Sequence, residues 1–416
     1  MTIRQALVRL RLILGIGLAM LFRQGYADDG STWRYVVPDS TGSGFASPTV
    51  VLPLADQRPE AIKTEPPASG GKRSYALLRY GSPNSPLLPI VVDQRDGEEF
   101  DLTIDFSRSG EMADARPIAG SGRARQLEIK SAITYRDRAA EEYPRQVLIR
   151  KSASGKSLSV ATLGYLAGGV TLGERTIAAR RVDGNANGLF ADPQDRLWLD
   201  MNGDGKFDPF DEQFPFQPVL SLEGQRYAMR SDEAGTRLAL DEITGIGKIV
   251  VKLETLPESF ELKELELSLA ARDGSVYSAR GSSEPIDVPP GEYATRALSL
   301  LLVHRQSEER WYFVFSRYDS PREQDWHAVA AAKEISIDPV GKLDFRLEGA
   351  ALEQKIPAGS EFRVEPGLYT QDGMLIQRCD EGAADTTDSY SQGRAAEVEL
   401  MRTDGTVISR HTSGFG

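Results

Sequence analysis

The sequence predicts an all-β, multi-domain protein. Short segments alternate polar and apolar side chains, or run apolar with β-branched residues, and turn residues separate them. No segment between positions 74 and 245 sustains the 3.6-residue period of an amphipathic helix. After position 247 turn signals recur about every ten residues, a spacing typical of β-sandwiches. We therefore expect several β-sandwich modules joined by turns and loops.

The first 27 residues have the plan of a secretory signal peptide. Arg4, Arg9 and Arg11 give a positive start, residues 12–22 form an apolar core, and Ala27 offers a small residue for cleavage. This core is shorter than the roughly 18 residues of a membrane-spanning helix, and no other run approaches that length. We expect a periplasmic or extracellular protein with no membrane span after cleavage. The alternative is an uncleaved membrane anchor.

The charge of the chain limits its partners. Removal of the leader takes away four of the 49 basic residues and none of the 61 acidic ones, so the formal charge changes from −12 to −16. Such an acidic surface repels nucleic acid and anionic membranes and attracts cations. The single cysteine, Cys379, excludes an intramolecular disulfide. We expect a half-buried thiol at a strand end, with an intermolecular bridge as the alternative.

Five regions follow from this pattern. After the signal peptide, residues 28–75 form an extended lead-in rich in Pro and Ser, with one or two strands. A β-rich domain is expected at 76–245, a β-sandwich domain at 246–349 and a small β domain at 350–416. The strands are expected at 74–80, 87–93, 99–106, 145–150, 157–163, 248–254, 264–271, 275–279, 286–293, 297–304, 310–318, 362–369, 374–378, 396–402 and 405–410. The sequence predicts a helical turn at 328–333.

One short phrase suggests the type of sandwich. Residues 286–293 read Ile-Asp-Val-Pro-Pro-Gly-Glu-Tyr, which resembles the strand-turn-strand corner of transthyretin-like bacterial modules. The resemblance covers eight residues. It implies Ig-like or transthyretin-like sandwiches, into which the loops described next are inserted.

Residues 200–211 have the ligand spacing of a calcium loop. Oxygen-bearing side chains stand at positions 1, 3, 5, 9 and 12, glycine stands at position 6, and the position-7 carbonyl adds a backbone oxygen. The side-chain ligands at these positions are Asp200, Asn202, Asp204, Asp208 and Asp211. The position-7 carbonyl is that of Lys206. Calcium takes six to eight oxygen ligands, so this loop is a candidate calcium site.

A second loop repeats the pattern seventeen residues upstream. Its candidate ligands are Asp183, Asn185, Asn187, the carbonyl of Leu189, Asp192 and Asp195. A degenerate third copy runs from Asp105 to Asp114 and has serines where the others have Asn or Asp. Each copy follows a strand-like run. The same residues also make plain hairpin turns, and for the third copy we expect only such a turn.

The loop at 200–211 resembles the duplicated calcium loops of bacterial dockerins, which share its opening and prefer Asp at position 12 where EF-hands prefer Glu. The resemblance implies calcium binding. Dockerin loops lead into helices that dock onto cohesins, whereas here Pro209 and Pro215 permit barely one helical turn. The paired pattern is also similar to calcium-loop segments in large exported bacterial proteins of unassigned role.

Electrostatics ranks the two loops. Four carboxylates must gather in the 200–211 loop, and each like-charge pair costs roughly 1–4 kcal/mol at about 4 Å. A divalent cation offsets this repulsion, so we expect the 200–211 loop to bind calcium more tightly than the 183 loop. Magnesium demands a tighter octahedron, and zinc lacks nearby His or Cys. We expect calcium to have a structural role, clamping the strand ends.

The sequence carries no enzymatic signature. His304, His327 and His411 are far apart, and no nucleophile elbow occurs. Residues 154–157, Ser-Gly-Lys-Ser, echo a phosphate loop but are better explained as a basic hairpin turn. We expect a non-enzymatic, exported calcium-binding protein that interacts with an envelope protein, an extracellular protein or a polysaccharide. The alternative is a carbohydrate-binding or carbohydrate-active accessory protein. Exposed aromatics beside paired carboxylates would favour it.

Overall fold

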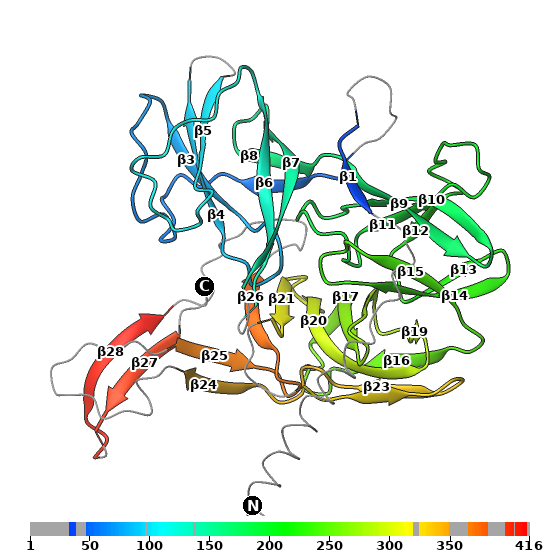
Figure 1. The fold of residues 1–416 in the computed structure, drawn as a ribbon. Helices are drawn as coiled ribbons and strands as arrows, with labels where there is room; N and C mark the ends of the chain where they lie inside the picture. Colours follow the sequence, from blue (N-terminus) through cyan, green and yellow to red (C-terminus); the bar gives the residue numbers. More distant parts are fainter. Residues whose placement is uncertain are drawn as a thin grey trace, which may run out of the picture.

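The computed structural model describes residues 33–38, 47–95, 99–135, 139–318, 324–348, 365–381, 396–402 and 404–413. All helix and strand assignments within these ranges are β-strands, which confirms the all-β prediction (Figure 1). None of the described segments is a helix with the length and apolar character that a bilayer crossing requires. The predicted signal peptide, 1–27, lies outside the described residues.

Two sheets pack around one core in the N-terminal part of the chain. The first contains β3 (Arg73–Leu78), β4 (Leu88–Gln94) and β5 (Phe100–Ile104). The second has the order β2 (Val50–Pro53), β8 (Ser157–Thr162), β7 (Glu141–Lys151) and β6 (Ala124–Ile133). Apolar side chains from both sheets form a single buried cluster that includes Ile90, Leu102 and Val160.

A five-stranded antiparallel sheet carries the two candidate loops. Its order is β1 (Arg34–Val36), β9 (Tyr165–Leu172), β10 (Arg175–Val182), β11 (Arg196–Leu199) and β12 (Gln213–Pro215). The loop from Asp183 connects β10 to β11, and the loop from Asp200 connects β11 to β12. Both loops therefore begin at strand ends, as the sequence predicted.

The largest sheet has eleven strands. Its main path is β13 (Val219–Leu222), β14 (Gln225–Ser231), β18 (Val276–Gly281), β17 (Phe260–Ala271), β20 (Gly291–His304), β21 (Arg310–Ser316), β26 (Leu375–Glu381), β25 (Glu365–Tyr369) and β24 (Asp344–Glu348). β15 (Leu238–Glu242) pairs with β14, and β22 (His327–Val329) pairs with β20. Leu265, Leu267 and Leu269 of β17 are buried while the residues between them are half-buried, as the alternation predicted.

Two small sheets complete the described structure. β16 (Gly247–Val251) lies between β19 (Ile286–Val288) and β23 (Glu334–Ile337) and pairs with β23 in parallel. β27 (Ala396–Met401) and β28 (Val407–Ser413) form a two-stranded ribbon. The corner between β19 and β20 is closed by the Tyr293 hydroxyl, which donates to the Pro289 carbonyl at 2.6 Å. Cys379 lies half-buried in β26.

The hydrogen-bonded sheets cross three of the expected domain boundaries. The lead-in is not separate, because β3 spans position 75 and β1 and β2 pair with β9 and β8. β13, β14 and β15 precede position 245 but belong to the eleven-stranded sheet, although only the pair Ser231–Val276 joins β14 to β18. β25 and β26, expected in the small C-terminal domain, extend the same sheet. The helical turn expected at 328–333 is wrong. His327 to Val329 form β22 and pair with Tyr293 to Gly291 of β20, so the start of this segment is extended. Residues 330–333 form a turn in which the Lys333 N–H donates to the Ala330 carbonyl at 3.1 Å.

Candidate metal centre

The loop between β10 and β11 is turned by the side chain of its first residue. Asp183 accepts hydrogen bonds from the backbone N–H groups of Asn185 (3.2 Å), Asn187 (3.3 Å) and Gly188 (2.6 Å). Gly188 has a φ of 80°. A Cβ at this position would lie 2.6 Å from the ring of Tyr80. Glycine at position 6 is therefore required both by the left-handed backbone and by the packing around it.

We expect Gly188→Ala to lower the free energy of unfolding by about 2 kcal/mol, since it combines a strained φ with overpacking. Gly203→Ala is the matched control. Gly203 also has a positive φ, 73°, but no atom lies within 4 Å of the added Cβ. It should cost about 1 kcal/mol from backbone strain alone. Urea denaturation of both variants measures the difference, and equal losses would contradict the packing argument.

Three carboxylates share one network in this loop. The two oxygens of Asp195 accept from the N–H of Gly184 (2.8 Å) and of Asp192 (2.7 Å). Asp192 Oδ2 in turn accepts from Nδ2 of Asn187 (2.6 Å) and Nδ2 of Asn185 (3.3 Å). Asp183 and Asp195 are 2% and 0% exposed, so two of these acids are fully removed from water. The five polar side chains predicted from the sequence therefore do lie together.

Burial and mutual repulsion disfavour the charged forms of these acids. Burial, with a smaller contribution from the charge of Asp192, raises the pKa of Asp183 to about 6. Burial and the charges of Asp192 and Asp183 raise the pKa of Asp195 well above its usual range. The pKa of Asp192 is also raised by burial, and the guanidinium groups of Arg296 and Arg181 oppose this only in part. A cation among these oxygens would offset the repulsion.

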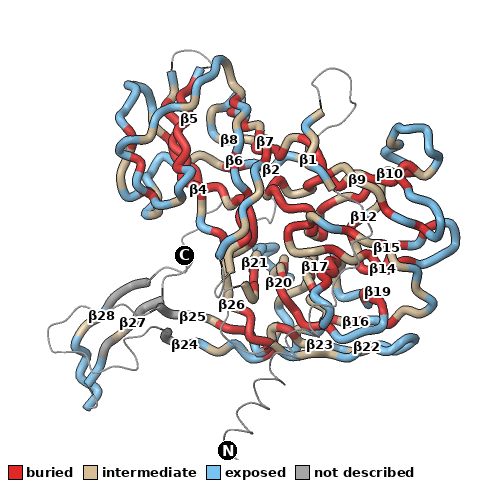
Figure 2. Tube along the Cα trace, viewed as in Figure 1, coloured by how far each residue is buried: buried red, intermediate tan, exposed pale blue. Residues whose placement is uncertain are grey.

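The same loop lies where three sheets meet. Its Asn187 and Gly188 carbonyls accept from Ser131 Oγ of β6 (3.2 Å) and Arg145 Nε of β7 (3.0 Å). The carbonyl of Ala191 accepts from Ser278 Oγ of β18. In Figure 2 buried segments alternate with half-buried ones in the elements near this loop. The conformation of the loop therefore affects the packing of the N-terminal sheets against the rest of the chain.

The loop between β11 and β12 is built differently. Asp200 is 8% exposed, and its Oδ2 accepts from the N–H of Gly205 at 3.0 Å. Its Oδ1 is buried and has no hydrogen-bond partner in the described part of the chain. The side chains of Asn202, Asp204 and Asp208 accept from backbone N–H groups two residues further on, at 2.7–2.8 Å. These three residues and Asp211 are exposed.

An acid that sequence reasoning did not select closes this loop. Glu212, one residue after the predicted position-12 ligand, is 3% exposed. Its Oε1 accepts from the N–H of Met201 (2.9 Å) and Asn202 (3.2 Å), and its Oε2 accepts from the N–H of Asp208 (2.9 Å). Its own N–H donates to the Asp208 carbonyl at 3.0 Å, forming a single helical turn. That turn places Glu212 inside the loop and leaves Asp211 outside.

The third copy of the pattern forms a turn satisfied by protein donors. Both oxygens of Asp105 accept hydrogen bonds, from Ser107 N–H (2.9 Å) and Oγ (2.5 Å) and from Gly110 N–H (2.7 Å) and Ser109 Oγ (3.3 Å). Burial opposes ionisation of Asp105, but these hydrogen bonds outweigh it and lower its pKa. A carboxylate stabilised in this way needs no cation.

Neither candidate loop holds a complete ligand set in this conformation. Among the described residues, no three His, Cys, Asp or Glu side chains converge closely enough to hold one metal ion. In the 183 loop the acids are buried, but the side-chain amides of Asn185 and Asn187 donate to Asp192 instead of presenting oxygen. In the 200 loop the side chains of Asn202, Asp204 and Asp208 accept hydrogen bonds from the loop's own backbone. The Leu189 side chain is 3% exposed and packs with Ile133 and Ala234, and its N–H donates to Asn187 Oδ1.

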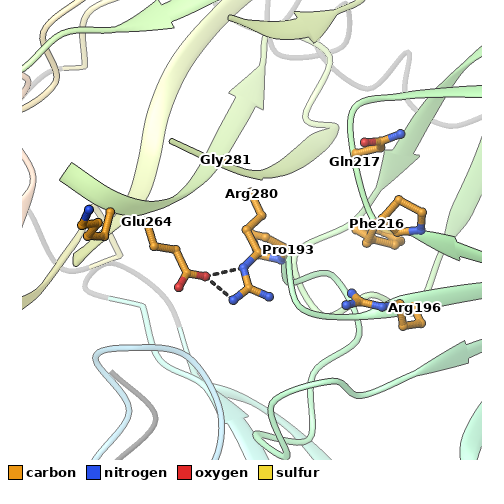
Figure 3. A pocket seen from close by; sticks show the side chains of 9 residues that line it. Pro193, Arg196, Phe216, Gln217, Glu264, Arg280 and Gly281 are labelled. Atoms are coloured by element: carbon orange, nitrogen blue, oxygen red, sulfur yellow. Dashed lines mark hydrogen bonds and ion pairs between the residues drawn. The ribbon is translucent and has the colours of Figure 1, made fainter. Parts of the chain in front are cut away.

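A pocket of about 460 Å³ lies beside the end of the 183 loop (Figure 3). Pro193 and Arg196 are among the lining residues, and Glu264 and Arg280 point toward one another. Glu266, on the same strand as Glu264, has its pKa raised to about 7 by burial. The guanidinium of Arg280 hydrogen-bonds to Glu264 and lies 3.9 Å from Glu266, so Glu264 is held in a structural ion pair with Arg280.

The aromatic side chains of β21 pack against the core. Trp311, Phe313 and Phe315 of β21 stack in one row, with ring centroids 6.5 and 6.3 Å apart, and contact the buried cluster of the eleven-stranded sheet. Their role in the described structure is packing.

Comparisons with known proteins give no family. No protein-family model and no curated protein matches this sequence. A solved structure, a leucine-rich repeat protein from Bacteroides thetaiotaomicron, aligns with 52% of this chain and 24% of its own length, at 9% identity and a TM-score of 0.17. The chain thus spans about a quarter of that protein, and a TM-score this low supports no conclusion about fold or function.

Proposed function

We propose that this chain is an exported calcium-binding protein, periplasmic or extracellular, in which calcium stabilises strand-end loops and the protein has an interaction role without enzymatic activity. The observation that carries the proposal is the buried carboxylate network of the 183 loop. Three acids whose ionisation is disfavoured in the metal-free protein stand at the junction of three sheets. Natural proteins seldom bury such groups without a compensating charge.

The donor set of the 183 loop suits a hard cation. Asp183, Asp192 and Asp195 offer carboxylate oxygens, and rotation of the amides of Asn185 and Asn187 would present oxygen where nitrogen now donates to Asp192. The Leu189 carbonyl would add the position-7 oxygen of a calcium loop. Calcium accepts irregular oxygen ligation more readily than magnesium does, which favours calcium here.

The 200 loop fits a second, more exposed site. The buried Oδ1 of Asp200 lacks a partner among the described residues, and such an orphaned carboxylate oxygen suits a cation. Glu212 replaces Asp211 as the buried acid, and Asn202, Asp204, Asp208 and the carbonyl of Lys206 complete the set. Because these residues are exposed, their side chains can turn inward without disturbing the core.

The position of the 183 loop supports a structural role for the metal. Its backbone accepts hydrogen bonds from β6, β7 and β18, so an ion that fixes the loop also fixes the contacts between those sheets. The partner we propose is another envelope or extracellular protein, or a polysaccharide. The half-buried Trp311 and Phe313 and the buried Phe315 of β21 pack against the core, so these aromatics give the carbohydrate-active alternative little support.

Calorimetric titration of the leaderless protein with calcium tests the proposal. We expect two sites with dissociation constants on the order of 10⁻⁴–10⁻³ M, as in extracellular modules. Asp192→Asn should remove the site of the 183 loop, and the double variant Asp200→Ala, Asp204→Ala should remove the other. Asp105→Asn, in the turn that resembles both loops, is the control and should keep both sites. Binding that survives in both loop variants would refute the assignment.

A further inference from the structure

A cationic pocket lies at one end of the N-terminal two-sheet unit. It has a volume of about 740 Å³ and is bordered by the turn between β7 and β8 and by residues of β3 and β4. Four basic residues line it, Lys72, Arg123, Lys151 and Lys156, against one acid, Asp56. This concentration of positive charge is unexpected in a chain with a formal charge of −12.

The central cation of this pocket has a largely buried side chain and no counter-charge among the described residues. Lys151 is 7% exposed, and among the described residues its ammonium forms no ion pair and no hydrogen bond. Its nitrogen lies 5.7 Å from the centre of the Phe100 ring and 3.7 Å from the point where a Cβ of Gly155 would stand. It is therefore held beneath the β7–β8 turn. Burial and the charge of Arg123 lower the pKa of Lys151, so no protein group there compensates its charge.

The acid in the lining does not neutralise Lys151. Asp56 pairs with Lys72 at 2.8 Å, and both side chains are about 70% exposed at the rim. The rest of the lining adds donors. Ser152 Oγ and Ser154 Oγ hydrogen-bond to each other at 3.2 Å in the β7–β8 turn and accept from the N–H groups of Ser157 and Lys156, so one of the two hydroxyl protons can be donated outward. The pocket thus offers ammonium and hydroxyl donors together, with the charge of Arg123 beside them.

We propose that this pocket binds a small oxyanion group, phosphate or sulfate, with Lys151 as the anchoring cation and Lys156, Arg123 and the turn hydroxyls around it. A compact anion with several acceptor oxygens matches such a set better than a planar or neutral ligand does. Residues 154–157 form the expected hairpin turn, and the proposed site uses its side chains rather than a glycine-rich backbone cradle. The group can come from free inorganic ion or from a phosphorylated sugar.

Titration calorimetry with inorganic phosphate and with glucose 6-phosphate, at constant ionic strength, distinguishes these sources. We expect saturable binding at one site. Stronger binding of glucose 6-phosphate than of inorganic phosphate would show that the pocket takes a phosphate group carried by a sugar. Equal or weaker binding would show that it takes the free ion. The absence of saturable binding of both ligands would overturn the proposal.

Variants locate the site. Lys151→Met should weaken binding at least tenfold while keeping or raising the melting temperature, since it replaces an unpaired buried charge by an apolar chain of similar length. Lys156→Gln, at the exposed rim, should weaken binding several-fold without affecting folding. Lys333→Gln changes an equally exposed turn lysine outside the pocket and should bind as the wild type does. Equal affinities of the Lys156→Gln and Lys333→Gln proteins, or undiminished binding by Lys151→Met, would place the anion elsewhere.

Discussion

Calcium at about one hundred times its dissociation constant should raise the free energy of unfolding by about 2.7 kcal/mol for each occupied site. For a dissociation constant of about 10⁻⁴ M this requires about 10 mM calcium. The effect follows from linkage alone, because the unfolded chain does not hold the oxygens together. Scanning calorimetry of the leaderless protein in calcium and in chelator measures it, and magnesium at the same concentration should give a smaller rise. An identical melting temperature in calcium and chelator would contradict the proposed role.

The Asp192→Asn variant distinguishes the stabilisation that calcium provides from the stability of the 183 loop without metal. In chelator, we expect this variant to be at least as stable as the wild type, because it removes a charge that opposes ionisation of Asp183 and Asp195. The amide oxygen can still accept from Asn187 and Asn185, as Oδ2 does now. The part of the calcium response that belongs to the 183 loop should disappear. A variant that is destabilised in chelator and keeps its full response would mean that Asp192 has only a packing role.

Many of the strands could be predicted because their signal is local, although β6, β9, β13, β14 and β15 were not expected from the sequence. The alternation of Glu or Ser with Leu in residues 261–269 reflects one solvated and one buried face, and β17 has that pattern of burial. The apolar run at 88–92 is buried on both faces, as part of β4. In residues 100–104 apolar side chains alternate with Asp101 and Thr103, yet both faces of β5 are buried. Turn residues between these runs mark the ends of the strands within a few positions.

The pairing of strands distant in sequence could not be predicted in the same way. β16 pairs with β23, more than eighty residues away, and no local feature of either strand selects the other. The boundary expected at 245 failed to separate the sheets for this reason. Alternation shows which face of a strand is buried but does not identify its neighbour.

The candidate loops were found by spacing, but spacing did not indicate which loop buries its carboxylates. A count of acids favoured the 200 loop, with four carboxylates against three in the other. In the structure most of those four are exposed, where water screens their repulsion, while Asp183 and Asp195 are fully buried. Glu212 was missed because the helical turn from Asp208 shifts the inward position by one residue. The adjacent Asp and Glu at 211 and 212 were the available signal.

Without calcium, the free energy of unfolding should fall as the pH rises from about 4 to about 6. The pKa of Asp183 is raised from 3.8 to about 6 in the folded protein, so between these values the folded state binds more protons than the unfolded state. Stability therefore decreases with pH in this window. The shift corresponds to a loss on the order of 3 kcal/mol for Asp183 alone. Asp195, raised well above its usual range, should extend the decline to higher pH.

Other carboxyl groups act in different windows or are coupled to the 183 loop. Burial opposes ionisation of Asp93, but its hydrogen bonds from Arg73 lower the net pKa, so its contribution to stability is lost only as the pH falls below about 4. Burial raises the pKa of Glu266 to about 7, and the charge of Asp192 adds to this shift, so Glu266 responds to calcium together with the loop. The difference between the two conditions therefore reports on the loop carboxylates and on Glu266, which is coupled to them.

Urea denaturation between pH 4 and 7.5, in calcium and in chelator, gives that difference directly. Calcium binds the deprotonated carboxylates, so the stabilisation it provides should be small near pH 4 and grow through pH 6. In Asp192→Asn the growth should be reduced to the contribution of the 200 loop. A calcium stabilisation that does not change between pH 4 and 7.5 would show that the ion does not compete with protons for Asp183 and Asp195, and would place it away from the junction of the three sheets.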